Sequence, residues 1–99
     1  MSEGFVNYTW EDKRRIECVL HVLDGQDIDA VRQILIATAK KEELVLKSPE
    51  PSVAVIGIEK GNAVLELRAW CSAKQDYELE ERLYEKSYKA LHGEGIEVL

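Results

Sequence analysis

The sequence has few of the features that mark several protein classes. Among its 99 residues are two prolines and two cysteines, Cys18 and Cys71, which do not form a Cys-x-x-Cys motif. Two cysteines are too few for a disulfide scaffold. No apolar run approaches the roughly 18 residues of a membrane-spanning helix. The N-terminus lacks the apolar stretch of a signal peptide, and internal repeats are absent.

Positive charge is also scarce. Thirteen Lys and Arg against 19 Asp and Glu give a net charge of −6, and the longest basic cluster is Lys13-Arg14-Arg15. An acidic chain repels phosphate backbones, so we expect no nucleic-acid partner. A hydrophobic content of 45% with 32% charged residues is typical of one folded globular domain.

The periodicity of the first half predicts a strand and a helix. Residues 1–13 are polar with scattered apolar residues, and we interpret them as a tail or linker before a domain at 14–99. Apolar and mixed positions alternate from Arg14 to Leu23, which predicts a strand ending in a turn at Asp24-Gly25. Asp27 is placed to cap an amphipathic helix from Ile28 to Lys41.

The second half predicts a hairpin, a second helix and a short last strand. The strands Val53–Glu59 and Ala63–Cys71 join around Lys60-Gly61. With Glu59 opposite Asn62, regular pairing puts six apolar residues on one core face: Ile58 with Ala63, Ile56 with Leu65, and Ala54 with Leu67. Asp76–His92 reads as a helix, and Ile96–Leu99 has room for a short strand.

The resulting order, βαββαβ, predicts an α+β fold of the ferredoxin-like kind. Right-handed crossovers place both helices on one face of a four-stranded antiparallel sheet. The expected spatial order of the strands is four, one, three, two. The fold alone does not give a function, because many activities share it.

The sequence lacks the residues that proteins of this fold use for metal binding, phosphatase activity or RNA binding. The loop Leu23–Asp27 has no cysteine pair for a soft metal, and it is too acidic for the anion cradle of a phosphatase. Only Trp70 offers an aromatic ring of the kind that RNA-binding sheets use. His21 and His92 have no companion residues that would make them metal ligands or bases. We therefore expect no enzyme activity, no metal and no cofactor.

The cysteines predict structural roles. Cys18 falls on the core side of the first strand and reads as a small buried apolar side chain. Cys71 is near the end of the third strand. Taking the first and third strands as parallel, we expect the two Cα atoms to lie beyond the 7 Å limit for a disulfide.

The sheet face away from the helices is the most informative surface. It is predicted to expose apolar residues beside Glu17, Glu66 and Arg68, and no third layer is left to cover it. Such a face suggests a partner surface. The alternative is that the N-terminal tail folds across it. The candidate interface residues are Val19, Leu23, Val53, Val55, Val64 and Trp70.

The most recognisable part of the sequence runs from Pro49-Glu50-Pro51 through Val53-Ala54-Val55 and a Gly-Asn turn to Leu65-Glu66-Leu67-Arg68-Ala69-Trp70. This stretch resembles the C-terminal cytoplasmic domain of small-conductance mechanosensitive (MscS-family) channels, and other segments agree in order and spacing. Val6-Asn7-Tyr8 resembles the end of that family's middle β-domain. Further similar stretches are Arg14-Arg15-Ile16, Asp27-Ile28-Asp29 and Gly95-Ile96-Glu97-Val98.

The resemblance implies a domain of a homoheptameric channel in the bacterial inner membrane, which opens under membrane tension and releases solutes during hypo-osmotic shock. In that family this domain forms part of a hollow cytoplasmic cage. The sequence lacks the family's transmembrane helices, pore helix and full middle domain. We therefore expect an excised cage domain that does not itself conduct ions.

Two other hypotheses stay open. One is a stand-alone regulatory module that binds a small ligand at a ferredoxin-like dimer interface. The other is a small hydrolase of the same fold, which the lack of a nucleophile and base disfavours. A genomic reading frame with apolar helices upstream would favour the channel domain, whereas a true start at Met1 would favour the module.

Overall fold

The computed structural model describes residues 12–23 and 25–98, so most of the predicted tail at 1–13 lies outside the described residues. These described residues form three strands, two α-helices and one 3-10 turn. In order these are β1 (Lys13–Val22), α1 (Ile28–Lys41), β2 (Ser52–Glu59), β3 (Asn62–Ser72), η2 (Ala73–Gln75) and α2 (Asp76–Gly93). The predicted helices and the first three predicted strands therefore exist, with ends within a residue of those expected.

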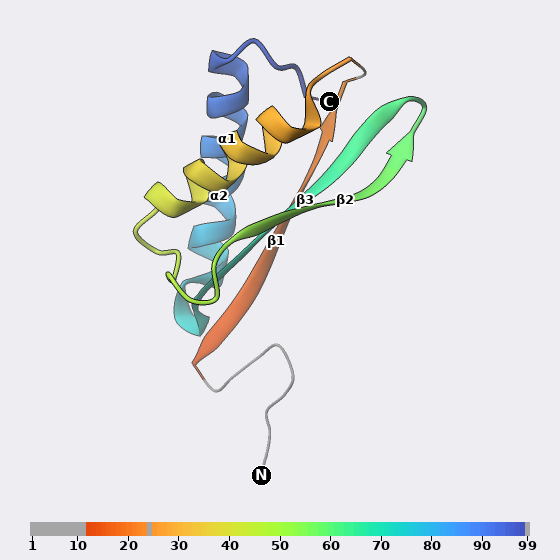
Figure 1. Ribbon diagram of the computed structural model, residues 1–99. Coiled ribbons are helices and arrows are strands. Elements are labelled where there is room, and N and C mark those ends of the chain that lie inside the picture. The colour runs from red at the N-terminus through yellow and green to blue at the C-terminus, as the bar shows by residue number, and fades with distance from the viewer. Residues whose placement is uncertain (1–11, 24, 99) are drawn as a thin grey trace.

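In the described part of the chain the sheet has three strands in the order β1-β3-β2, and both neighbouring pairs are antiparallel. Both helices lie on one side of it, and the β2–β3 hairpin projects beyond them (Figure 1). The predicted fourth strand is reduced to one antiparallel bridge between Val22 and Val98 within the described residues. The amide of Leu23 also donates to the carbonyl of Glu97 at 3.3 Å. This single bridge lies on the edge of β1 where the fourth strand was expected.

Local signals explain both helices. Asp27 caps α1 as predicted, because its side chain accepts hydrogen bonds from the amides of Asp29 and Ala30. Residues spaced by four turn the same side of each helix inward. The buried residues are Val31, Leu35 and Ala39 in α1, and Leu79, Leu83, Ser87 and Leu91 in α2.

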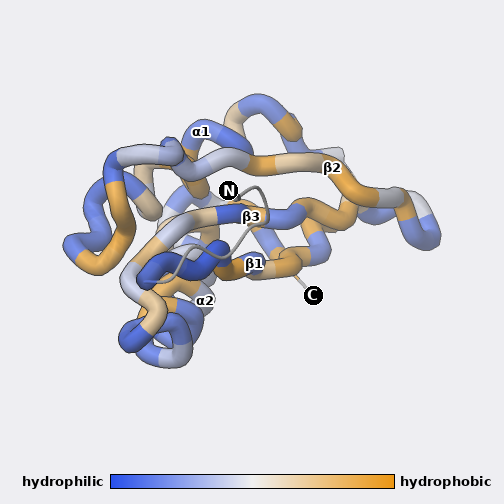
Figure 2. The backbone as a smooth tube through the Cα atoms, turned by 90° about the horizontal axis from the view of Figure 1, so that it is seen from below, coloured by the Kyte–Doolittle hydropathy of each residue, from blue (hydrophilic) through white to orange (hydrophobic). Residues whose placement is uncertain are grey.

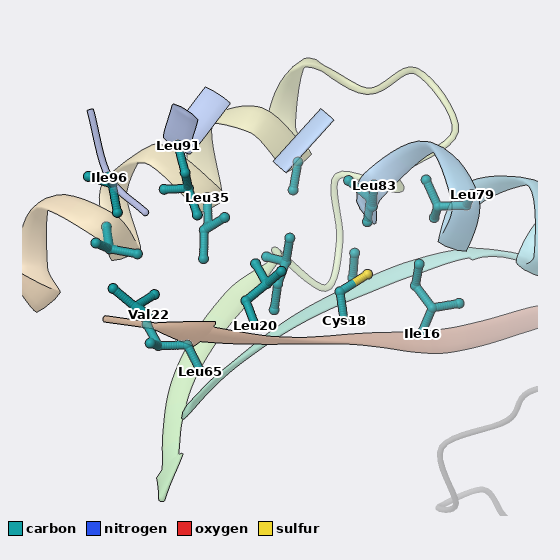
Figure 3. Close-up of a cluster of buried hydrophobic side chains, with 14 of the residues drawn as sticks. Ile16, Cys18, Leu20, Val22, Leu35, Leu65, Leu79, Leu83, Leu91 and Ile96 are labelled. Atoms are coloured by element: carbon teal, nitrogen blue, oxygen red, sulfur yellow. The ribbon is translucent and has the colours of Figure 1, made fainter. Parts of the chain in front are cut away.

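The core fills the space between the sheet and the helices (Figure 3). Strand β1 contributes Ile16, Cys18, Leu20 and Val22, whose side chains point toward Leu35, Leu79, Leu83 and Leu91 of the helices. Leu67 of the central strand is fully buried, as the sequence predicts. Removing this apolar surface from water is the main contribution to the stability of the fold.

The β2–β3 pairing contains a β-bulge that the sequence analysis did not anticipate. From the turn, Ile58 pairs with Ala63 and Gly57 with Val64, as predicted. The register then shifts at Ile56, so that Val55 pairs with Leu65. The predicted pairing of Ile56 with Leu65 is therefore wrong. A glycine within a strand favours such a bulge because it adds no side chain to the packing.

The bulge reverses which residues of β2 face the helices. Val53 pairs with Leu67 and packs against the core, whereas Ala54 pairs with Glu66. The predicted pairing of Ala54 with Leu67 is therefore also wrong. Each face of a strand takes alternate residues, so one inserted residue exchanges the two faces for the rest of the strand.

A pair of lysine substitutions tests this register. We expect Val53→Lys to lower the free energy of unfolding by about 1–3 kcal/mol, because it places an ammonium against the core. Ala54→Lys should change it by less than about 0.5 kcal/mol, because the new side chain faces Glu66 across the strands. Urea titration of both variants measures the difference. A larger loss for Ala54→Lys than for Val53→Lys would contradict the bulge and restore the regular pairing.

Candidate interaction surface

The face of the sheet opposite the helices mixes ion pairs with a few apolar residues. Arg15 pairs with Glu17 at 2.8 Å on β1, and Arg68 pairs with Glu66 at 2.6 Å on β3. Glu17 and Arg68 are themselves opposite one another across the two strands. Charged residues of both signs therefore occupy the middle of this face, which we call the open face.

Three of the candidate interface residues lie on the open face. Val19 is 37% exposed, whereas Val64 and Trp70 are buried. Their strand partners on this face are Glu66, His21 and Arg15 respectively. The predicted apolar face is therefore present but small. The use of this face as an interface stays a prediction. The alternative, that the N-terminal tail folds across the face, concerns residues outside those the structure describes.

The other three candidates do not join them. Val53 and Val55 pair with core residues of β3, because the bulge turns them toward the helix side. The prediction that these two valines lie on the open face is thus wrong. Leu23 lies beyond the end of β1, where it lines a shallow hollow together with Ile28 and Ile58.

A second apolar surface lies on the projecting hairpin. Val55, Ile56 and Ile58 are 42%, 49% and 73% exposed. Figure 2 shows the hydrophobic stretch of β2 that continues toward the hairpin end. Isolated two-stranded hairpins are marginally stable in water, so an apolar hairpin that extends past its helices is typical of a surface covered in an assembly.

The most tightly connected polar group is Glu42, immediately after α1. Its side chain is fully buried. Oε1 accepts hydrogen bonds from Lys86 Nζ at 2.6 Å and from Arg82 Nε at 3.1 Å. Oε2 accepts one from the amide of Leu44 at 3.1 Å and lies 3.0 Å from Arg82 Nη2. This Glu42 cluster connects the end of α1 to the middle of α2.

The electrostatics of the cluster follow from these contacts. Burial alone would raise the pKa of Glu42, but the hydrogen bonds from Lys86, Leu44 and Arg82 outweigh it and hold the pKa below its ordinary value of 4.5. The adjacent carboxylate raises the pKa of Arg82. Both partners are therefore ionised at neutral pH.

Sequence reasoning missed the Glu42 cluster. The local pairs on this helix, Glu78 with Arg82 and Glu85 with Lys89, have the four-residue spacing of neighbours on a helix surface. The shared partner of Arg82 and Lys86 is 40 and 44 residues away, so no local spacing indicates it. The available signal was that Arg82 and Lys86 are four residues apart and share one face of the helix.

Both cysteines are buried and have thiols of low reactivity. Burial, with a smaller contribution from Glu80, raises the pKa of Cys18 to about 12, and burial next to Asp76 raises that of Cys71. Both are free thiols, as expected. The assumption that the first and third strands are parallel was wrong, because β1 and β3 pair antiparallel. In this pairing Cys18 is opposite Leu67, and Cys71 is opposite Arg14. A thiol with a raised pKa is a poor nucleophile or ligand.

Each histidine lies beside one charged or aromatic side chain. His21 Nδ1 lies 3.8 Å from a carboxylate oxygen of Glu59, and His92 stacks on Tyr88 with ring centroids 5.9 Å apart. Asp27 caps α1, and Asp29 pairs with Arg32 at 2.9 Å. Within residues 12–23 and 25–98, no three His, Cys, Asp or Glu side chains gather as a metal site.

Neither helix in the described part of the chain is both long and apolar enough to cross a membrane.

Comparison with solved structures finds the same fold in parts of MscS and MSL1. The chain superposes on part of MscS from Helicobacter pylori, solved in its closed state, with a TM-score of 0.80 and 23% identity over 87% of its residues. It superposes on part of MSL1 from Arabidopsis thaliana with a TM-score of 0.77 and 15% identity over 89%. A variant of MSL1 gives 0.70 with 17% identity.

The chain corresponds to only part of each of these longer proteins. The chain spans about a third of each of these channel chains, 34% of the H. pylori and of the A. thaliana protein. No family model and no curated protein sequence matches it. The resemblance to MscS channels that the sequence indicates is therefore confirmed at the level of fold.

Replacing the buried carboxylate tests the Glu42 cluster. We expect Glu42→Gln to lower the free energy of unfolding by about 1–3 kcal/mol at pH 7, because charge-assisted hydrogen bonds are lost. The pKa of Glu42 is lowered on folding, so its contribution is present above pH 4.5 and is lost as the pH falls through the folded-state pKa. The difference between parent and variant should therefore shrink in acid.

Urea titrations of Glu42→Gln and the parent between pH 3 and pH 7 measure this difference. The matched control is Glu43→Gln, because Glu43 is exposed and 3.9 Å from the same arginine. Its loss should stay below about 0.5 kcal/mol. A difference for Glu42→Gln that does not vary with pH, or an equal loss for Glu43→Gln, would contradict the assignment.

Proposed function

We propose that this chain is a cytoplasmic cage domain of a mechanosensitive channel, with a structural and assembly role. The observation that carries the proposal is the superposition on H. pylori MscS over 87% of the chain. The sequence resemblance, which was identified from different information, supports the same family. In the longer protein the domain would lie on the cytoplasmic side of the bacterial inner membrane and would not itself conduct ions.

The proposal includes the assembly state and the completed fold. The longer chain would form a homoheptamer that releases solutes during hypo-osmotic shock. The bridge between Val22 and Val98 supports a ferredoxin-like arrangement in which a fourth strand pairs with the free edge of β1. That position agrees with the expected strand order of four, one, three, two.

A cage role is compatible with the surfaces of the domain. The exposed apolar residues of the hairpin and the mixed open face both offer area for a neighbouring domain or subunit. The net charge of −6 would concentrate cations near the cage wall, an effect screened over about 8 Å at physiological salt. No step of this role needs a catalytic group.

A charge on the open face tests the assembly role in the longer channel. Val19→Lys puts an ammonium among Val64 and the ion pairs of this face, and its desolvation would oppose contact with a neighbour. We expect the purified full-length variant to form fewer complete oligomers than the parent. Gln33→Lys, an exposed position on α1, is the matched control. Size-exclusion chromatography with light scattering measures the oligomers, and parent-like assembly of Val19→Lys would show that the open face is not an assembly surface.

A further inference from the structure

The loop after α1 forms a hollow with an unusual lining. The hollow has a volume of about 270 Å³ and is lined by Lys40, Val45, Leu46, Lys47, Glu50 and Pro51. Its floor is apolar. Neither lysine nor Glu50 forms an ion pair within the described residues. The ammonium groups of Lys40 and Lys47 therefore flank an apolar hollow whose lining includes one carboxylate, that of Glu50.

The most exposed aromatic side chain of the described residues is Tyr77, in the first turn of α2. It is 81% exposed, whereas Tyr84 accepts a hydrogen bond from the amide of Val19 and Tyr88 stacks on His92. The neighbours of Tyr77 on the helix surface are Glu80 and Glu81, three and four residues further on. Neither forms an ion pair within the described residues.

We propose that the Tyr77 side chain of one copy of this chain occupies the Lys40–Lys47 hollow of the next copy. The two surfaces are complementary in charge, because Glu80 and Glu81 would face Lys40 and Lys47. They are also compatible in size. A cavity of about 150 Å³ accepts a benzene ring, so a phenol ring fits this larger hollow. Tyrosine is enriched at the centre of protein interfaces for this combination of apolar ring and polar tip.

The occupant is a second copy rather than the chain's own tyrosine. Tyr77 does not line the hollow, and its exposure shows that it is not inserted anywhere in its own chain. Both features nevertheless lie at the same end of the domain. The amide of Leu46 donates to the carbonyl of Trp70 at 2.8 Å, and α2 begins shortly after the end of β3 (Figure 1).

A contact between two different surfaces of identical chains is head-to-tail. Each copy offers its hollow to one neighbour and its tyrosine to the other, so the contact propagates and closes only into a ring. This inference rests on the proposed role as a repeated channel subunit and names the surfaces that meet. In the isolated chain the contact is a single small one, so we expect dissociation constants in the high micromolar to millimolar range.

Two variants that each remove one side of the contact provide the test. Tyr77→Ala removes the ring but keeps the hollow, and Lys47→Glu reverses a charge in the hollow but keeps the ring. Sedimentation equilibrium of the 99-residue chain measures association. We expect the parent to grow beyond a dimer with concentration and each variant alone to associate at least tenfold more weakly. An equimolar mixture of the two should recover a one-to-one dimer, because one intact contact remains.

The controls keep the outcomes separable. Tyr88→Ala removes another exposed tyrosine of α2, and Lys60→Glu reverses a charge on the hairpin; both should associate like the parent. Circular dichroism confirms that each variant is folded. A parent that stays monomeric, a mixture that stays monomeric, or controls that weaken association equally would overturn the proposed contact. None of these results would affect the cage-domain proposal if the full-length protein still assembles.

Discussion

The buried carboxylate of Glu42 positions parts of this domain that the sheet does not hold. The β-sheet fixes three strands, but the helices could slide over its apolar face, because apolar contacts have little directional preference. Glu42 is fixed at the end of α1 and accepts hydrogen bonds from two side chains of α2. It also binds the amide of Leu44 and so sets the direction in which the chain leaves the helix.

The Glu42 cluster also fixes the geometry of the loop that follows α1. Leu44 and Val45 pack against the core, and Leu46 donates its amide to the end of β3. The same turn that satisfies Glu42 therefore forms the hollow flanked by Lys40 and Lys47. Burying a charge is costly unless its hydrogen bonds are complete, and here the two cations remain partly solvated while the carboxylate is enclosed. That arrangement puts most of the desolvation cost on the carboxylate.

What the sequence could predict followed from how local each signal was. The limits of α1 depend on Asp27 and on apolar spacing, which are neighbours in sequence, and they were predicted correctly. The pairing near Lys60-Gly61 was also correct, because the turn fixes it. The pairing beyond Gly57 was not, because alternation assumes an unbroken strand, and a glycine favours a bulge without fixing whether one forms. The Glu42 cluster was missed because it joins residues 40 positions apart.

The same distinction applies to the candidate interface. Val19, Val64 and Trp70 were placed correctly, because β1 and β3 pair without interruption. Val53 and Val55 were placed on the wrong face by the single inserted residue. The exposure of the hairpin depends on how far the helices extend over the sheet, and the hollow after α1 depends on the turn at Glu42; periodicity reports neither. The family resemblance depends on the order of many short segments, and the fold comparison agrees with it.

The most direct measurement of the central claim is a chimeric channel. Residues 12–98 of this chain would replace the superposing segment of H. pylori MscS, and patch-clamp recording would measure tension-activated current. A control rebuilt at the same junctions would carry the native MscS segment. If this chain is a cage domain, the chimera assembles and opens under membrane tension. A chimera that is expressed and folded but neither assembles nor opens, while the control does both, would contradict the account.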